Sequence, residues 1–344
     1  MGPGVNGTKM AAEMAEQPAV LADLIGRRAN LLSRLRDAAP AHPAGVLLVA
    51  RGSSDHAAVF GRYVLEAACG RPVALAAPSL QTLYGVRVDY RGYLAVAVSQ
   101  SGRTPEIVAV LRAARDAGAR TVAITNDAES PLAGAAEAVI ELGAGKELAV
   151  PATKTFTAQV AAFAILAEAL GDVPWGEREW SRLPDLVEEV LGNPEPSRSV
   201  AAAIGEAHGL ITVGRGYLYA VALEASLKLK ETAGILAQGY SAADLRHGPL
   251  TVVERGFPVL SFVARGPAEA DMNDLIGTLR RREARVFRVA EDPAAELPVP
   301  KGIHEPLVAI PMAVRAQQVA HALALHRGLD PDAPPGLSKV TLTR

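Results

Sequence analysis

The 344-residue chain is long enough for two domains, and its cores must be built from Ala, Val, Leu and Ile, because only 4% of its residues are aromatic. A net charge of -2 without a long Lys/Arg run provides no footprint for nucleic acid, and no apolar stretch reaches the roughly 20 residues of a membrane span. Cys69 is the only cysteine, which excludes an intramolecular disulfide and argues against a thiolate metal site, so we expect a cytoplasmic protein.

The N-terminal residues divide into a short leader and a helical region. Residues 1–9 are Gly-rich and lack the apolar core of a secretory signal, so we expect a tag-like or disordered N-terminus. Residues 10–43 have Ala, Leu and Met spaced three and four apart, which predicts helices that end before Pro40 and Pro43.

A first domain is expected over residues 44–172. Its short apolar runs are too short for helices and predict buried strands at residues 46–50, 94–98, 121–125 and 138–141. Helical spacing predicts helices at residues 55–68, 104–117 and 158–170. Strands that alternate with helices across short turns predict a doubly wound parallel sheet.

A second domain is expected over residues 199–329, after a charged, partly helical connecting segment at residues 173–198. Its predicted strands lie at residues 210–213, 259–263 and 286–289, and its helices at residues 219–236, 268–283 and 308–326. The strand at 210–213 runs into Gly214-Arg-Gly216, as the strand at 46–50 runs into Arg51-Gly52. The sequence therefore predicts two α/β domains of the same kind, followed by a C-terminal tail at residues 330–344.

Two turns of the first domain are suited to bind a phosphate. Ser99-Gln-Ser-Gly-Arg-Thr104 combines three hydroxyls and an amide around a glycine, and Gly52-Ser-Ser54 adds two hydroxyls from a neighbouring strand. Such turns lie at the carboxyl ends of strands, where helix N-termini favour anions. The alternative is that these residues only cap helices and form turns. Neither turn has the Walker pattern, and no G-x-G-x-x-G follows a strand, so nucleotide binding lacks support.

Groups that can move protons occur in the second domain. Glu224, Lys228 and Glu231 share one face of the helix predicted at residues 219–236, and His247 follows in a Gly-Pro turn. A carboxylate and an imidazole together can serve as acid and base on a sugar. The alternatives are a solvated ion-pair face for the first three residues and a polar surface position for His247.

The C-terminal tail carries one further candidate. Asp330-Pro-Asp-Ala-Pro-Pro-Gly336 forms a rigid, extended approach to an apolar and β-branched stretch that contains Lys339. This composition is compatible with a disordered tail, and its apolar residues also suggest a segment that docks.

In combination, these motifs resemble the SIS-domain phosphosugar proteins, and specifically the isomerase half of glucosamine-6-phosphate synthase and its stand-alone relatives. The resemblance runs from Met10 to the end of the chain and includes two further motifs, Ala152-Thr-Lys-Thr-Phe-Thr157 and Leu223-Glu-Ala-Ser-Leu-Lys-Leu-Lys-Glu231. It implies two tandem SIS domains, each a doubly wound, mainly parallel five-stranded sheet flanked by helices. Arg51-Gly-Ser-Ser-Asp-His56 and the Asp330–Val340 ending look most similar to the SIS-type glucosamine-6-phosphate deaminases.

The resemblance also implies roles for individual residues. The positions that match phosphate binders are Ser53, Ser99, Gln100, Ser101 and Thr104. Ser54 and Val150 match contacts to the sugar hydroxyls. The catalytic positions are Glu231 as the base between C1 and C2, His247 for ring opening, Lys228 near the open-chain oxygen, Glu224 in support of it, and Lys339 from the tail. In the family the histidine comes from the partner subunit, which implies a homodimer.

The chain departs from the synthase pattern at three points. We expect no glutaminase domain before the first SIS domain, and Arg51 and Ala152 replace a Cys and a Ser of the family. The resemblance implies an isomerising deaminase that needs no metal or redox cofactor and converts glucosamine 6-phosphate and water into fructose 6-phosphate and ammonia. The alternatives are a deglycase of glycated amino-acid phosphates, a galactosamine-phosphate deaminase, an aldose–ketose isomerase and a non-catalytic phosphosugar sensor.

Overall fold

The computed structural model describes residues 7–339, which form two compact units. The first-sheet unit consists of residues 19–147 and 154–181. The second-sheet unit consists of residues 7–18, 148–153 and 182–339. Each unit holds one sheet, so the predicted pair of α/β folds is confirmed.

The first sheet contains five parallel strands in the order β2-β1-β3-β4-β5. Their bounds are β1 Val46–Val49, β2 Val73–Leu75, β3 Leu94–Ser99, β4 Arg120–Thr125 and β5 Ala138–Glu141. Four of these strands were predicted from their apolar runs. The fifth, β2, has three residues, of which only Val73 is buried, and so gives almost no pattern in the sequence.

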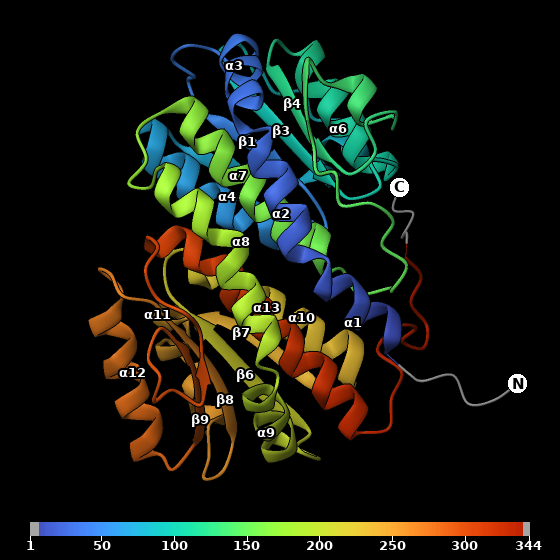
Figure 1. Cartoon of the computed structure of the whole chain (residues 1–344). Helices are drawn as coiled ribbons and strands as arrows, with labels where there is room; N and C mark the ends of the chain where they lie inside the picture. Colours follow the sequence, from blue (N-terminus) through green and yellow to red (C-terminus); the bar gives the residue numbers. More distant parts are fainter. Residues whose placement is uncertain (1–6, 340–344) are drawn as a thin grey trace, which may run out of the picture. The chain divides into compact units, whose positions relative to one another are not determined.

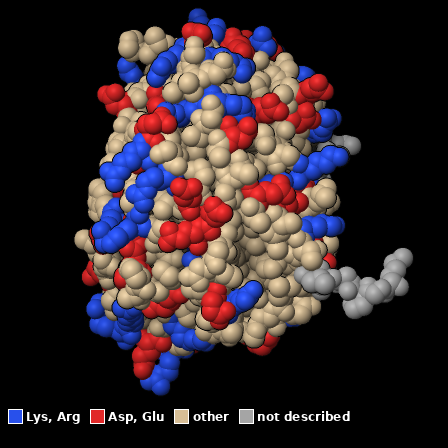
Figure 2. Space-filling model, viewed as in Figure 1, with Lys and Arg blue, Asp and Glu red and all other residues tan. Residues whose placement is uncertain are grey.

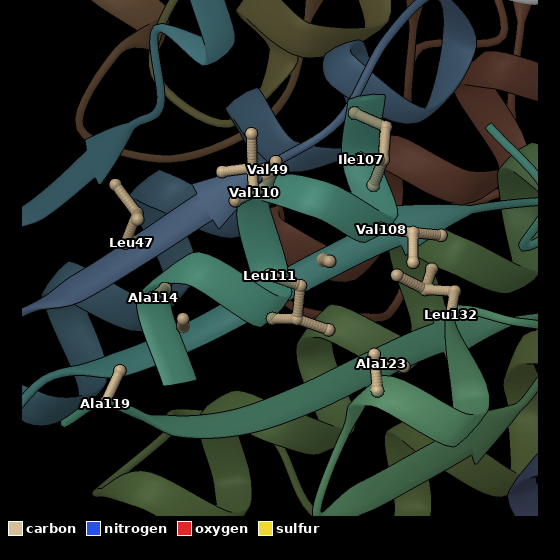
Figure 3. Packing of buried hydrophobic residues seen from close by; sticks show 13 residues of the cluster. Leu47, Val49, Ile107, Val108, Val110, Leu111, Ala114, Ala119, Ala123 and Leu132 are labelled. Carbon is tan, nitrogen blue, oxygen red and sulfur yellow. The ribbon is translucent and has the colours of Figure 1, made fainter. Parts of the chain in front are cut away.

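Helices flank both faces of the first sheet (Figure 1). Their bounds are α2 Gln17–Gly26, α3 Arg28–Ala38, α4 Ser53–Cys69, α5 Pro78–Thr82, α6 Pro105–Asp116, the 3-10 turn η1 Ala133–Ala135 and α7 Lys154–Leu170. On one face, Ile107, Leu111 and Ala114 of α6 pack on Leu47 and Val49 of β1, as Figure 3 shows. On the other face, α4 and α7 approach so closely that a Cβ on Gly61 would lie 2.5 Å from the Phe163 ring.

The second sheet repeats this topology. Its five parallel strands have the order β10-β9-β8-β6-β7, which read in reverse matches the first sheet strand for strand. The bounds are β6 Gly209–Gly214, β7 Leu236–Ser241, β8 Pro258–Val263, β9 Arg285–Ala290 and β10 Leu297–Pro298. The sequence indicated three of these strands and missed β7 and β10, because β7 alternates buried and exposed residues and β10 has two residues.

The remaining helices have the bounds α1 Thr8–Ala15, α8 Glu177–Gly192, α9 Glu195–Ile204, α10 Leu218–Ala233, α11 Ala242–Arg246, η2 Pro249–Val252, α12 Glu269–Arg281 and α13 Glu305–His326. In the second-sheet unit, α12 covers one face of the sheet, while α10 and α13 lie on the other (Figure 1). The charged segment 173–198 forms α8 and the start of α9, and its Trp180 is fully buried.

On the face that Figure 2 shows, acidic and basic side chains are interspersed. Within residues 7–339 we find no helix that is long and apolar enough to cross a membrane.

Candidate functional site

The turn between β3 and α6 is shaped by its own side chains. Ser99 ends β3 with 7% of its surface exposed, and its Oγ accepts a hydrogen bond from the Gly102 amide at 3.2 Å. Ser101 Oγ accepts one from the Arg103 amide at 3.3 Å. Gly102 has a φ of 61°, and a Cβ there would meet the Ser130 hydroxyl. The turn thus requires a glycine at this position and presents its hydroxyls in a fixed arrangement.

The start of α6 adds further donors to this turn. Thr104 occupies the N-cap position with extended backbone, yet its hydroxyl makes no capping hydrogen bond. Pro105 follows at the first helical position, where the amide of any other residue would have no partner within the helix. The amides of this first turn and the Thr104 hydroxyl can therefore serve an anion.

The turn after β1 lies beside the turn after β3, because these two strands pair directly. Gly52 has a φ of 60° and precedes α4, whose first residue is Ser53. The chain leaves β1 and β3 toward opposite edges of the sheet, so the two turns flank a topological switch point, which is where ligands bind in open α/β sheets. Ser54 is buried, and its Oγ accepts a hydrogen bond from Gln159 Nε2 at 3.0 Å.

An ion pair joins these two turns. Arg51 Nε donates to Glu106 Oε2 at 3.0 Å, and Arg51 Nη2 donates to Glu106 Oε1 at 3.1 Å. The carboxylate of Glu106 is 6% exposed, whereas the side chain of Arg51 is 46% exposed. This bidentate pair fixes the turn after β1 against the first turn of α6, and it neutralises a carboxylate that would otherwise repel a phosphate.

The three charged residues on α10 form a buried group. Lys228 has 1% of its side chain exposed, and its Nζ lies 3.5 Å from Glu224 Oε1 and donates a hydrogen bond to Glu231 Oε2. The exposed fraction of the side chain is 3% for Glu224 and 20% for Glu231. This burial excludes the alternative of a solvated ion-pair face. Buried charges are costly unless they are paired, and such groups are frequent at functional sites.

His247 also belongs to the second-sheet unit. It is the C-cap of α11, is exposed, and its backbone amide donates to the Asp244 carbonyl at 3.1 Å. Within the described residues, no hydrogen bond or ion pair links its ring to the Glu224–Lys228–Glu231 group. The imidazole is therefore open to a ligand or to another chain.

Val150 and Lys339 lie in segments without regular structure. The Val150 amide donates to the Asp332 carbonyl at 2.9 Å, which attaches the segment 148–150 to the start of the C-terminal tail. Lys339 is partly exposed and is the last residue that the structure describes. The rest of the predicted tail, residues 340–344, lies outside the described residues, as do residues 1–6 of the predicted N-terminal leader.

The structure thus groups the candidate residues in two sets. Ser53, Ser54, Ser99, Gln100, Ser101 and Thr104 belong to the first-sheet unit. Val150, Glu224, Lys228, Glu231, His247 and Lys339 belong to the second-sheet unit. In residues 7–339, no three His, Cys, Asp or Glu side chains are grouped so that they could hold a metal ion.

Sequence reasoning missed four residues that support these sets, three through their side chains and Asp332 through its backbone carbonyl. Glu106 and Gln159 hold Arg51 and Ser54, and Glu13 and Asp332 hold the segment 148–150. Each acts on a residue at least 55 positions away, so no local pattern marks it. The only signal in the sequence is Arg51, which replaces a Cys of the family. An arginine in a turn predicted to bind phosphate suggests that an acidic partner lies nearby.

Comparison with known proteins agrees with this arrangement of sheets and turns. The model of the SIS domain family matches residues 42–169 and again residues 203–326. The chain belongs to the SIS domain family. The two matches fall on the two sheets, so each sheet with its helices is one SIS domain.

Curated relatives align with nearly the whole chain. The glutamine–fructose-6-phosphate aminotransferase (isomerizing) of Methanothermobacter thermautotrophicus is 31% identical over 341 residues, which cover 96% of this chain and 56% of that protein. The enzyme of the same name from Streptomyces coelicolor is 33% identical, over 96% of this chain and 58% of its own length. The SIS chain therefore spans little more than half the length of these relatives.

Solved structures match both SIS domains together. A protein from Silicibacter pomeroyi described as a phosphosugar isomerase has a TM-score of 0.84 and 36% identity, and the match covers 95% of this chain and 100% of that one. Glucosamine-6-phosphate deaminase from Thermotoga maritima has a TM-score of 0.79 and 24% identity over 98% of this chain and 100% of that one, a likeness of fold.

Proposed function

We propose that this SIS protein acts in the cytoplasm as an isomerising deaminase of an amino-sugar phosphate, most directly glucosamine 6-phosphate. The observation that carries the proposal is the buried Lys228 held between Glu224 and Glu231 on α10. The packing of a core needs no charged side chains, so a buried lysine enclosed by two carboxylates indicates a functional group, and this group suits proton transfer on a sugar. The names of the relatives, which concern phosphosugars, support the same substrate class.

In this proposal the substrate phosphate binds at residues 99–104 with Ser53. The hydroxyls and amides of these turns match the many acceptor sites of a phosphate, which carries about -1.5 to -2 charges at pH 7. Ser54 and Val150 would contact the sugar hydroxyls. Ser54 can still donate its own hydrogen, because its oxygen accepts from Gln159.

The chemistry begins with ring opening, assisted by His247, which produces an aldehyde at C1 beside the amine at C2. Glu231 removes the proton from C2 and returns it to C1, while the C1 oxygen gains the proton that the amine loses. Lys228 relays this second proton, supported by Glu224, and Lys339 completes the sugar contacts. Water adds to the resulting C2 imine and releases ammonia, which leaves the ketone of fructose 6-phosphate. Proton transfer and hydrolysis require neither metal nor redox cofactor.

The base is tested by Glu231→Gln, which keeps the size of the side chain and removes its basicity. We expect turnover of glucosamine 6-phosphate, measured as ammonia and fructose 6-phosphate in equal amounts, to fall by about 10²–10⁴-fold with little change in phosphosugar affinity. Glu254→Gln, at an exposed position of the same unit, serves as the matched control and should retain wild-type turnover. Full activity of the Glu231 variant would exclude this residue as the base.

We also propose a homodimer in which each site takes His247 from the partner chain, because the exposed imidazole is not joined to the Lys228 group of its own chain. Glu231→Gln and His247→Ala chains, each inactive alone, should regain up to about a quarter of wild-type turnover when unfolded and refolded together, since mixed dimers hold one intact site. If mixed dimers form, as detected by their mass, but turnover does not recover, His247 acts within its own chain.

A second candidate is an aldose–ketose isomerase, which the 36% identity to the Silicibacter pomeroyi protein favours. The same base would move a proton between C1 and C2 of a sugar that carries a hydroxyl at C2, and no ammonia would form. A panel of glucosamine, galactosamine, glucose and tagatose 6-phosphates separates the two. Ammonia release identifies the deaminase, and interconversion of aldose and ketose without ammonia identifies the isomerase.

A further inference from the structure

Helix α1 receives its N-terminal cap from the far end of the chain. Gly7 precedes the helix and has no side chain, and the first turn contains no acidic residue. The amides of Lys9 and Met10 instead donate to the carboxylate oxygens of Asp332, at 3.1 and 2.8 Å. Asp332 is 8% exposed. A carboxylate here satisfies amides that have no partner within the helix and interacts favourably with the helix dipole.

Asp332 also holds the segment that contains Val150. Its carbonyl accepts a hydrogen bond from the Val150 amide at 2.9 Å. The same segment is held from α1, because the carboxylate of Glu13, which is 4% exposed, accepts hydrogen bonds from the amides of Leu148 and Ala149. Helix α1, residues 148–150 and Asp332 therefore form one connected group.

The beginning of the tail is packed tightly onto this group. His321 Nε2 of α13 lies 3.0 Å from the Gly7 carbonyl. Gly7 has a φ of 78°, and a Cβ there would lie 2.7 Å from His321 Nε2 and 2.9 Å from Pro331 Cγ. The Asp332 amide donates to Asp330 Oδ1 at 3.0 Å, which closes a local turn. The chain at residues 330–332 is thus fixed by contacts on both sides.

The path from this anchor to Lys339 is short and stiff. Six residues lie between Asp332 and Lys339. Pro334 and Pro335 restrict the backbone, and the Leu337 amide donates to the Pro334 carbonyl at 3.3 Å in a turn. A short tether that begins at a fixed point confines its end to a small volume and raises the effective concentration of the group it carries.

We propose that Asp332 is a positioning residue that fixes the C-terminal tail on α1 and on residues 148–150, and thereby sets where Lys339 lies. This inference rests on the proposed function, in which Lys339 contacts the sugar. Asp332 acts through the tail, so its loss should affect the chemical step more than phosphate binding, which the proposal assigns to the first-sheet unit.

The test compares Asp332→Ala with Asp292→Ala. Asp292 is a matched control in the same unit, because its Oδ1 accepts a hydrogen bond from the Ala294 amide at 2.9 Å but has no connection to the tail. With glucosamine 6-phosphate as substrate, we expect Asp332→Ala to lower kcat by about 10- to 100-fold with less than about threefold change in KM, and Asp292→Ala to change neither. Asp332→Asn, which keeps one acceptor oxygen, should recover part of the loss.

A double-mutant cycle decides whether Asp332 acts through the lysine. In a Lys339→Ala background, the added Asp332→Ala should lower kcat by less than about twofold, because the group it positions is already gone. Losses that multiply would overturn the proposal, and so would wild-type kcat in Asp332→Ala or an equal loss in Asp292→Ala.

Hydrogen exchange tests the anchor without reference to activity. Folded Asp332→Ala, checked by thermal unfolding, should exchange the amides of residues 9 and 10, which the side chain of Asp332 caps, at least about tenfold faster than wild type, with the protection of β6 and β8 unchanged. Unchanged exchange at these amides would overturn the anchor. A wild-type protein that turns over none of the phosphosugars would refute the proposed function instead, and the exchange result would still decide the anchor.

Discussion

The turn that follows β3 and the turn that follows β8 occupy equivalent places in two sheets of the same strand order, yet their chemistry is opposite. Residues 99–104 bring three hydroxyls and an amide to the first helix turn of α6. At the second position the chain has Arg265 and Gly266, and two carboxyls, Glu291 and Glu305, lie nearby. The Arg265 amide donates to Glu291 Oε2 at 3.4 Å, so this backbone donor is already used.

The difference separates what the fold provides from what the site requires. A parallel sheet with diverging connections places a turn and a helix N-terminus at both positions. In the described residues, the turn of the first sheet presents the hydroxyls of Ser99, Ser101 and Thr104, while the turn of the second sheet has the carboxyls of Glu291 and Glu305 beside it. In the proposed function, the first SIS domain therefore binds the phosphate, and the second moves the protons through its helix α10.

The largest effect is expected from the glycines of the two turns. Gly102→Ala places a methyl group against Ser130 at a φ of 61°, so it should distort the turn and weaken binding of fructose 6-phosphate by about 100-fold or more. Gly266→Ala is an equally crowded change, at a φ of 155° and against Glu305. It should lower the melting temperature while leaving the Kd for fructose 6-phosphate, measured by calorimetry, unchanged. A comparable loss of affinity in both variants would contradict the assignment of phosphate binding to one turn.

An intermediate effect is expected from the arginine that joins the two turns of the first sheet. Arg51→Ala leaves the Glu106 carboxylate without its bidentate partner, so KM for the phosphosugar should rise by about fivefold, since the half-exposed Arg51 limits the pair to about 1 kcal/mol. Arg288→Ala in the second-sheet unit also removes an arginine that bonds two carboxylates, Asp292 and Glu296, and it should leave KM unchanged. Steady-state kinetics at two salt concentrations checks both variants, and an unchanged KM in Arg51→Ala would show that the ion pair is only structural.

The sequence predicted the strands whose apolar runs are continuous, because a strand buried on both faces needs no partner to be recognised. It missed β2, β7 and β10, which are short or only half buried and are defined by their neighbours. The same distinction holds for the site. Residues 99–104 and the charged face of α10 were visible as local spacing, whereas Glu106, Gln159 and Asp332 act across long sequence separations that only folding closes.

The smallest effect concerns the acidic side chains of the second turn. Burial raises the pKa of both Glu291 and Glu305 above the usual value of 4.5. The neighbouring Glu291 carboxylate raises the pKa of Glu305 further, whereas hydrogen bonds from backbone amides offset part of the rise for Glu291. A carboxyl whose pKa is higher in the folded state binds its proton more tightly there than in the unfolded chain, so it contributes stability at low pH that is lost as the pH rises through the raised pKa. In Glu305→Gln, the free energy of unfolding should therefore depend less on pH from about pH 4.5 upward. At neutral pH it should be higher than in wild type by about 0.5–1 kcal/mol. A steeper profile in Glu305→Gln, measured by chemical denaturation, would show that the Glu305 carboxylate is stabilised by the fold.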